Sequence, residues 1–324
     1  MVGVDKPQGI SSHDVVDRAR RVFDERRVGH TGTLDPLATG VLVLCVGPAT
    51  RLAPYLQSHD KRYRFTVVFG SSTDTDDAAG KVVQTGEAPE EVCDPLFAQG
   101  FVERLVGTHQ QRPPAYSAIQ VDGQRAYKAA RAGKAIDLAP REVEVYEASL
   151  LGVDAGMPGS SPSWDIAVHV SKGTYIRSLT RDIGEALGCP SHVGELARTS
   201  LGPLPLEACV SLPDLEGLKE KAALDPVALL GCRMVMVEGS DKAGAQNGKA
   251  LPAGAFVVRD CPQMPPYAAR PAPQAPPEAG HKALLPGELI AVATEDSLIG
   301  LFRYDRPAQA LKAECVFAGG IARG

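Results

Sequence analysis

The chain contains the loop sequence Gly29-His30-Thr31-Gly32-Thr33-Leu34-Asp35-Pro36-Leu37-Ala38-Thr39-Gly40, which continues into the apolar run Val41-Leu42-Val43-Leu44-Cys45-Val46-Gly47. Three glycines and an Asp-Pro step within twelve residues disfavour a regular helix or strand and predict a shaped loop. Residues 41–46 predict a buried strand that anchors it. Asp35 is the only carboxylate of the loop and His30 its only imidazole. The loop is therefore the first candidate for a site that holds one reactive side chain in place.

Two other interpretations of this loop stay open from its local sequence. Asp35 followed by Pro36 is also typical of a helix N-cap with proline at the first helical position, and His30 can be an ordinary loop histidine. A phosphate-binding loop is excluded, because no Lys-Ser or Lys-Thr step follows the glycines.

The segments on either side of the loop predict a helix and a strand. Residues 6–12 form a turn that leads into a helix with Ser12 as its N-cap, and apolar residues recur on one face over residues 15–23. Residues 64–69 are rich in β-branched and aromatic side chains and predict a strand, with Tyr63 at its start.

A second helix is expected from near Tyr175 to Gly188. Arg177 lies in its first turn, where a cation opposes the helix dipole, which indicates a role other than helix stability. The apolar stripe that predicts this helix consists of Leu179, Ile183 and Leu187.

Three motifs together resemble the bacterial tRNA pseudouridine-55 synthases, the TruB-type family. The loop of residues 29–40 matches the pattern G-H-T-G-x-L-D-P-x-A-x-G, and the match continues to Arg51. The pattern K-P-x-G-x-S-S at residues 6–12 and the pattern S-K-G-T-Y-I-R at residues 171–177 match the same family. The resemblance is strong over residues 3–210 and weak beyond them.

This resemblance implies an active site built around Asp35 as the catalytic carboxylate. Arg177 is implied to pair with it and keep it ionised, and Lys6 to brace the loop. The family reaction converts uridine to its C-glycoside isomer without a redox step or an outside acceptor, so no cofactor or metal is implied. Whether the carboxylate attacks C1′, attacks C6 or deprotonates the sugar stays open.

The same resemblance places three residues against the target base. Tyr63 is implied to stack on the base, a task that suits a π-face with a polar tip, while Tyr175 lines the base pocket and Leu196 forms its apolar wall. Taken alone, Tyr63 and Leu196 also fit an ordinary strand aromatic and a core residue. The base must be flipped out of its loop, and His30 is our candidate for filling the vacated space or holding the flipped nucleotide.

The distribution of charge bears on an RNA partner more than its sum does. The net charge is −5, but residues 71–107 hold eight acids and two bases, whereas residues 108–141 hold six bases and two acids. A local basic excess suits phosphate binding, and it also fits a solvated helix face. By resemblance, residues 108–141 form an RNA-binding insertion that closes over the T arm of tRNA. Two positions depart from the family pattern, because Gln120 replaces a usual lysine and Ala197 replaces the first arginine of Leu-Arg-Arg.

We expect an α+β fold with a mixed, mainly antiparallel pseudouridine-synthase sheet flanked by helices. A small C-terminal β-barrel-like (PUA-like) RNA-binding domain is expected after it. The predicted domains are residues 1–232 and residues 233–324, with a Pro-rich insertion at residues 261–280 that contains seven prolines.

Three finer expectations concern local structure. A short helix is expected over residues 89–106. The acidic segment 74–80 lacks the closing glutamate of a calcium loop, so it predicts a turn between strands. The strand candidates of the C-terminal domain are residues 254–258, 288–293, 298–303 and 313–317, with a hairpin across residues 294–297.

Composition narrows the remaining possibilities. No apolar run reaches about 18 residues, so no membrane span is expected. The seven cysteines form no C-x-x-C pair, which argues against a zinc site and fits the cytoplasm. We expect a monomer with no obligate protein partner. Two other functions compete with the synthase: an RNA-binding folding helper that needs no Asp35, and a hydrolase that needs a second positioned carboxylate.

Overall fold

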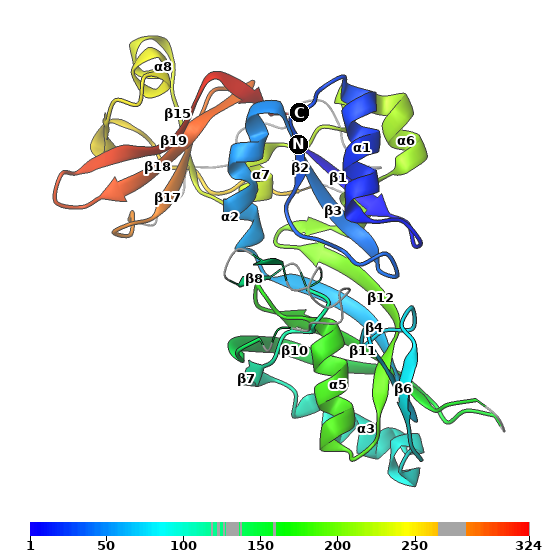
Figure 1. Cartoon of the computed structure of the whole chain (residues 1–324). Helices are drawn as coiled ribbons and strands as arrows, with labels where there is room; N and C mark the ends of the chain where they lie inside the picture. The colour runs from blue at the N-terminus through cyan, green and yellow to red at the C-terminus, as the bar shows by residue number, and fades with distance from the viewer. Residues whose placement is uncertain are drawn as a thin grey trace.

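A mixed sheet forms the frame on which the loop of residues 29–40, the signature loop, is held (Figure 1). The computed structural model describes residues 1–117, 119–121, 124, 125, 127, 136, 138–157, 160–264 and 283–323. Within these residues the sheet has ten strands: β1 (Val2–Lys6), β2 (Val28–His30), β3 (Thr39–Val46), β4 (Lys61–Phe69), β7 (Gly107–Gln111), β10 (Arg141–Asp154), β11 (Ser163–Val170), β12 (Ser191–Leu201), β13 (Leu204–Pro205) and β14 (Val210–Ser211).

The strands follow the order β14-β1-β3-β12-β4-β11-β10-β7, with β13 paired to β12 and β2 paired to β3. Among the described strands of this sheet, β1 and β14 pair in parallel, as do β3 and β12, and the other neighbours are antiparallel. This arrangement confirms the mixed, mainly antiparallel α+β fold. Two further hairpins join β5 (Ser71–Thr73) to β6 (Val82–Thr85), and β8 (Gln120–Val121) to β9 (Gln124–Arg125).

Two hydrophobic cores lie against this sheet. The first joins the sheet to helices α1 (Ser12–Phe23), α3 (Pro95–Glu103), α5 (Ile176–Ala186) and α6 (Leu212–Leu218), and Trp164 is fully buried in it. The second contains the alternate side chains of β3 together with residues of α2 (Ala53–Gln57) and α7 (Pro226–Leu230). Because β3 alternates its side chains between both cores, the strand that leaves the signature loop is buried on both faces.

Two local expectations were wrong in detail. The N-cap of α1 is Ser11, whose hydroxyl accepts the backbone N–H of Asp14 at 3.2 Å, and not Ser12. The helix expected over residues 89–106 is divided into the 3₁₀ turn η2 (Glu90–Cys93) and α3, because Asp94 caps a new helix that has Pro95 at its first position. The acidic segment 74–80 does lie between two strands, β5 and β6.

The tail, residues 233–323, is built on a separate five-stranded sheet within the described part of the chain. Its order is β15-β17-β18-β19-β16. The strands are β15 (Met234–Met236), β16 (Leu251–Pro252), β17 (Leu289–Ala293), β18 (Ser297–Asp305) and β19 (Ala310–Ala322), and α8 (Gly239–Gln246) packs beside them. The hairpin across residues 294–297 is confirmed. The strand expected at residues 254–258 is wrong, because η5 (Ala253–Ala255) and an irregular segment occupy that place.

The domain boundary expected between residues 232 and 233 stays a prediction. Most of the Pro-rich insertion, residues 265–280, lies outside the described residues, as do Lys128, Arg131 and Lys134 of the basic insertion.

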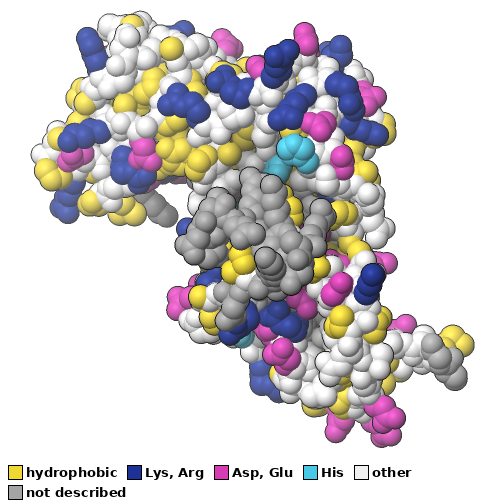
Figure 2. Space-filling view, viewed as in Figure 1, with side chains coloured by type: hydrophobic (Ala, Val, Ile, Leu, Met, Phe, Trp, Pro, Cys, Tyr) yellow, Lys and Arg dark blue, Asp and Glu magenta, His cyan; other side chains and the backbone are white. Residues whose placement is uncertain are grey.

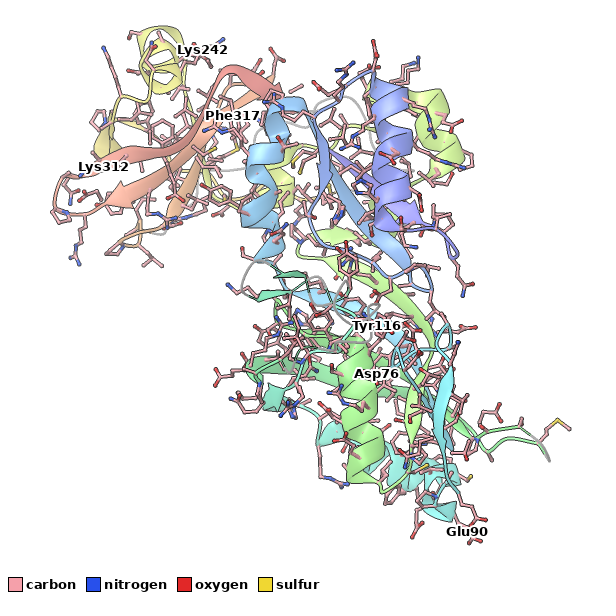
Figure 3. All side chains as sticks on the ribbon, in the orientation of Figure 1. Asp76, Glu90, Tyr116, Lys242, Lys312 and Phe317 are labelled. Atoms are coloured by element: carbon pink, nitrogen blue, oxygen red, sulfur yellow. The ribbon has the colours of Figure 1, made fainter. Side chains whose placement is uncertain are left out.

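The tail packs directly against the segment that follows β3. Arg51, in the 3₁₀ turn η1 (Gly47–Leu52), donates to the carbonyl of Val316 at 2.7 Å and stacks over the ring of Phe317. Tyr55 of α2 donates to Glu314 at 3.1 Å. Figure 3 shows Phe317 on the side of the tail that meets α2. The tail is therefore attached to the same strand that carries the signature loop.

The end of the signature loop approaches β12 closely. Gly40 has a φ of +98° and is paired with Arg198 of β12. A Cβ atom at Gly40 would lie 2.2 Å from the Arg198 carbonyl oxygen. Only glycine satisfies both the left-handed backbone and this contact.

We predict that Gly40→Ala destabilises the fold by about 2–4 kcal/mol, because the new methyl group must displace backbone while the residue keeps a positive φ. Thermal unfolding measures the change. Gly29→Ala is the matched control, since no atom lies within 4 Å of its added Cβ and its φ is not positive. Equal melting temperatures for the two variants would contradict this account of the contact.

Candidate active site

The signature loop is mostly irregular backbone, and hydrogen bonds from Gly9 and from Ser12 at the start of α1 hold it in place. The Ser12 hydroxyl donates to the Leu34 carbonyl at 3.0 Å and accepts the Leu34 N–H at 2.8 Å. The backbone N–H of Gly9 donates to the Pro36 carbonyl at 2.8 Å. No helix begins at Asp35, so the interpretation of Asp35 as an N-cap is wrong. These bonds fix the backbone on both sides of the Asp35 carboxylate.

Asp35 forms a two-point ion pair with Arg177, as the resemblance implied. The Nε atom of Arg177 lies 2.9 Å from Oδ2 of Asp35, and its Nη2 atom lies 3.2 Å from Oδ1. The Arg177 side chain is 5% exposed, whereas that of Asp35 is 33% exposed. The pair therefore joins a buried, oriented cation to a carboxylate that still reaches the surface, as a reactive group requires.

Two carbonyls and a second carboxylate hold the guanidinium from the other side. Arg177 donates through Nη1 to the Thr75 carbonyl and through Nη2 to the Tyr116 carbonyl, both at 2.9 Å. Oδ2 of the buried Asp77 lies 4.0 Å from Nε. Figure 3 shows Tyr116 above the start of α5. It also shows Asp76, which precedes Asp77 in the chain, beside the same helix. The acidic turn at residues 74–80 is thus part of the site.

Arg198 holds the signature loop to the sheet. It is 2% exposed, donates through Nε to the Val41 carbonyl at 2.7 Å, and donates through Nη2 to the Gly32 carbonyl at 3.1 Å. No role for Arg198 followed from the sequence. The signal that could have identified it is its place two residues after Leu196, on the same face of the strand, where a cation needs backbone or acidic partners.

Burial sets the protonation of the charged groups at the site. It raises the pKa of Asp35, an effect that the Arg177 guanidinium opposes and Asp77 adds to. Burial also lowers the pKa of Lys6 to about 8, although the Asp35 charge opposes this. Lys6 donates to the carbonyls of Pro7 and Ile10, both at 2.8 Å. Its contacts fit the bracing role that the resemblance gave it.

Tyr63 and Leu196 lie on adjacent strands beneath the loop. Each is 8% exposed, and both belong to the core that also contains Leu34 of the loop. Tyr63 is paired with Arg198 across β4 and β12, and Leu196 is paired with Phe65. They therefore lie together beneath the loop, although their contact with a base stays a prediction.

Tyr175 and His30 occupy the margins of the site. The backbone N–H of Tyr175 donates to the Gln111 side chain at 2.8 Å, and the Arg141 guanidinium lies 4.7 Å from its ring centroid. His30 accepts the Gly32 N–H at 3.3 Å, and burial lowers its pKa, so the ring tends to be neutral. Within the described residues, neither side chain bonds to Asp35.

The surface around the site carries basic side chains. Figure 2 shows Lys and Arg side chains, interspersed with Asp and Glu, over α1 and over the tail. Among the described residues, no three His, Cys, Asp or Glu side chains come close enough to hold a metal ion. No helix in the described part is long and apolar enough to cross a bilayer.

Comparison with solved structures identifies the fold. An H/ACA ribonucleoprotein bound to a substrate RNA containing 2′-deoxyuridine aligns over 98% of this chain and 84% of its own, with a TM-score of 0.66 at 23% identity. An archaeal box H/ACA Nop10–Cbf5 complex aligns over 97% of this chain and 85% of its own, with a TM-score of 0.65 at 24% identity. At such identities, the likeness concerns the fold alone.

Sequence comparison identifies the family. Residues 20–176 match the model described as "TruB family pseudouridylate synthase (N terminal domain)", and residues 177–231 match "tRNA pseudouridylate synthase B C-terminal domain". The tRNA pseudouridine synthase B of Geobacter sulfurreducens is 39% identical over 305 residues, which are 93% of this chain and 94% of that protein. That of Deinococcus radiodurans is 43% identical over 241 residues, 66% and 78% of the two chains.

The chain is therefore a pseudouridylate synthase, an isomerase. Within that class, it belongs to the TruB family.

The ion pair predicts how the reaction depends on pH. The Arg177 cation opposes the effect of burial on Asp35, so its removal raises the pKa of Asp35 further. As the pH is lowered, the carboxylate of the variant therefore becomes protonated at a higher pH than that of the wild type. We expect Arg177→Gln to lower kcat by about 100-fold or more and to move the acid limb of the rate–pH profile upward. Arg177→Lys keeps the charge but not the two-point geometry. It should therefore return the acid limb of the rate–pH profile close to its wild-type position while kcat stays reduced. An unmoved acid limb in Arg177→Gln would contradict electrostatic control of Asp35.

Proposed function

We propose that this chain isomerises uridine 55 in the TΨC loop of tRNA to pseudouridine, with Asp35 as the catalytic carboxylate. The observation that carries the assignment of the site is the two-point pairing of Asp35 with the buried Arg177. Both residues lie in segments that match the family models. The relatives' shared name, tRNA pseudouridine synthase B, supports tRNA as the substrate.

The reaction breaks the N1–C1′ glycosidic bond, turns the uracil, and joins C5 to C1′, after which C5 loses a proton and N1 gains one. Asp35 can act on C1′, on C6 or as a base on the sugar, and these routes stay open. Each route needs an ionised carboxylate held at a fixed angle, and Arg177 and the loop hydrogen bonds supply both. Tyr63, Leu196 and Tyr175 are proposed to retain the detached base by stacking and apolar contact.

The target uridine must leave its folded loop before it can reach Asp35, at a cost of a few kcal/mol. Basic side chains over α1 and the tail can offset this cost through contacts with the RNA backbone. The insertion at residues 108–141 is proposed to close over the T arm, although Gln120 supplies no charge for it. We expect the protein to act as a monomer in the cytoplasm.

Tritium release from tRNA transcripts labelled at uridine C5 tests the proposal. We expect the wild type to release tritium only when uridine 55 is present, and Asp35→Asn to release none while still binding tRNA. Asp17→Asn is a matched control, because Asp17 is an exposed carboxylate on α1.

The outcomes separate catalysis from binding. Release by Asp35→Asn at the wild-type rate would remove Asp35 from the chemistry. Binding of tRNA without release by either protein would favour an RNA-binding folding helper.

His30 gives a second test of the site. If His30 fills the space left by the flipped base, His30→Ala lowers kcat/KM by about tenfold, equivalent to about 1.4 kcal/mol of lost stabilisation of the flipped state. Fluorescence of a 2-aminopurine next to the target measures flipping directly. Full activity and unchanged fluorescence in His30→Ala would remove this role. Asp17→Asn, the exposed control on α1, serves as control here as well.

A further inference from the structure

A pocket of about 360 Å³ lies where β4 and β12 pass the tip of the signature loop, and of its lining residues the function proposed above uses Leu196 alone. In Figure 1, these two strands run side by side immediately below β3. Leu37 of the signature loop and Leu196, which the proposed function places against the base, line this pocket, which we call the strand-junction pocket. The pocket therefore shares Leu196 with the candidate base site.

Two unpaired side chains of opposite charge face this pocket, Arg64 from β4 and Glu195 from β12. Within the described part of the chain, neither side chain forms an ion pair or a hydrogen bond, and they do not pair with each other. The third charged group of the pocket, Asp165, is already engaged by the Thr66 hydroxyl at 2.6 Å. A ligand that fills the pocket thus meets one free guanidinium and one free carboxylate.

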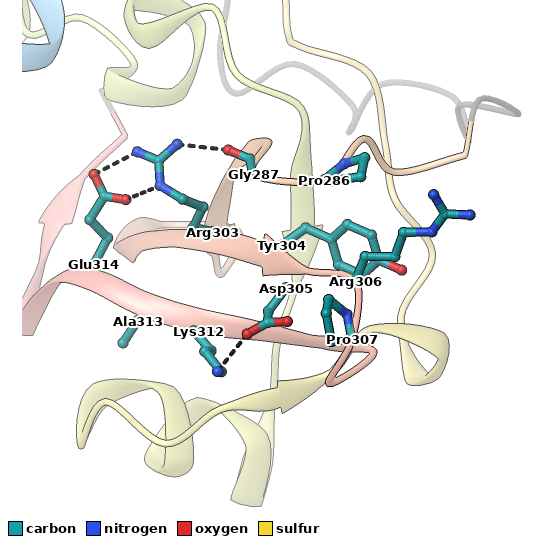
Figure 4. Close-up of a pocket in the computed structure, with 10 residues that line it drawn as sticks. All are labelled: Pro286, Gly287, Arg303, Tyr304, Asp305, Arg306, Pro307, Lys312, Ala313 and Glu314. Carbon is teal, nitrogen blue, oxygen red and sulfur yellow. Dashed lines mark hydrogen bonds and ion pairs between the residues drawn. The ribbon is translucent and has the colours of Figure 1, made fainter.

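The tail has a pocket of about 480 Å³ that differs in this respect (Figure 4). Its Arg303 forms a two-point pair with Glu314, and its Lys312 pairs with Asp305. The strand-junction pocket is the better candidate for a polar ligand, because both of its charged side chains named above are free.

Ala197 also lines the strand-junction pocket. This is the position at which the sequence departs from the family's usual arginine. A small side chain leaves space that a long one would fill, and it leaves Arg64 without a second cation beside it. The departure therefore coincides with the open volume.

We propose that the strand-junction pocket binds a guanine base. A carboxylate accepts best from two adjacent N–H groups, and guanine presents them at N1 and N2. A guanidinium fork donates best to two adjacent acceptors, and guanine presents O6 and N7. Among the four RNA bases, guanine alone offers both pairs. Leu37, Leu151 and Ala197 supply apolar surface beside its ring, and Leu151 is 47% exposed.

The base can come from two sources, a guanosine of the substrate RNA or a free guanine nucleotide. The RNA source rests on the proposed function, because it requires the chain to bind tRNA at this cleft. The pocket would then add a sequence-reading contact to the same binding event.

Atom-level substitution in the RNA tests the pairing. Guanosines of the T arm are replaced one at a time by inosine, which lacks the N2 amine, or by 7-deazaguanosine, which lacks N7, and kcat/KM is measured by tritium release. At one position, we expect each replacement to lower kcat/KM about tenfold with the wild type. Glu195→Gln should then be insensitive to inosine, and Arg64→Gln insensitive to 7-deazaguanosine.

Two further variants control for charge and space. Ala197→Arg fills the pocket and should remove sensitivity to both replacements. Arg62→Gln removes a cation two residues away that is already paired with Glu147, so it should keep both sensitivities.

Equilibrium dialysis with GMP distinguishes the sources. Binding of GMP by the wild type but not by Arg64→Gln or Glu195→Gln, with no RNA position sensitive, identifies the free nucleotide. No sensitive position and no GMP binding overturn the guanine pocket. Tritium release by the wild type on unmodified transcripts reports the proposed function separately, so the two failures are distinguishable.

Discussion

The ion pair between Asp35 and Arg177 is the constraint on which the rest of the site depends. Its members lie 142 residues apart in the chain, so the pair forms only when the signature loop and α5 are brought to the same sheet. The cation is buried and held by the Thr75 and Tyr116 carbonyls, while the carboxylate keeps a third of its surface exposed. Burial raises the pKa of Asp35, and the Arg177 cation opposes this rise. The cation therefore favours the ionised form of the carboxylate.

The sheet keeps this ion pair rigid because it holds both ends of the signature loop. The loop leaves through β3, which is buried on both faces, and meets β12 through the close backbone contact at Gly40. Arg198 adds a side-chain contact to the same loop through the Gly32 carbonyl. The tail is fixed to the segment immediately after β3 through Arg51. β3 and the turn that follows it thus link the signature loop to the tail. A rigid link of this kind suits a large substrate with a defined shape.

The sequence was informative where chemistry is concentrated in a continuous motif. The loop and its strand followed from residues 29–46, whereas the α+β class and the pairing of Asp35 with Arg177 followed from the family resemblance. The partners of Arg177 did not, because two of them are backbone carbonyls, whose positions depend on tertiary structure and carry no signal in a side chain. Asp77 was hidden in an acidic turn that looks like solvent-facing loop. The strand wrongly expected at residues 254–258 shows the opposite error, because this apolar run neither pairs as a strand nor is buried, and Val257 is 61% exposed.

Departures from a family pattern locate what is particular to one member. Asp35, Arg177 and the signature loop follow the TruB pattern, so they account for the proposed reaction without accounting for any individual preference for RNA. Ala197 departs from that pattern and lines a cavity beside the signature loop, together with Arg64 and Glu195, for which the described part of the chain offers no charged partner. A chain with a net charge of −5 cannot rely on bulk attraction to hold a polyanion. Local contacts must then supply selectivity, and a pocket that recognises one base supplies it without adding charge.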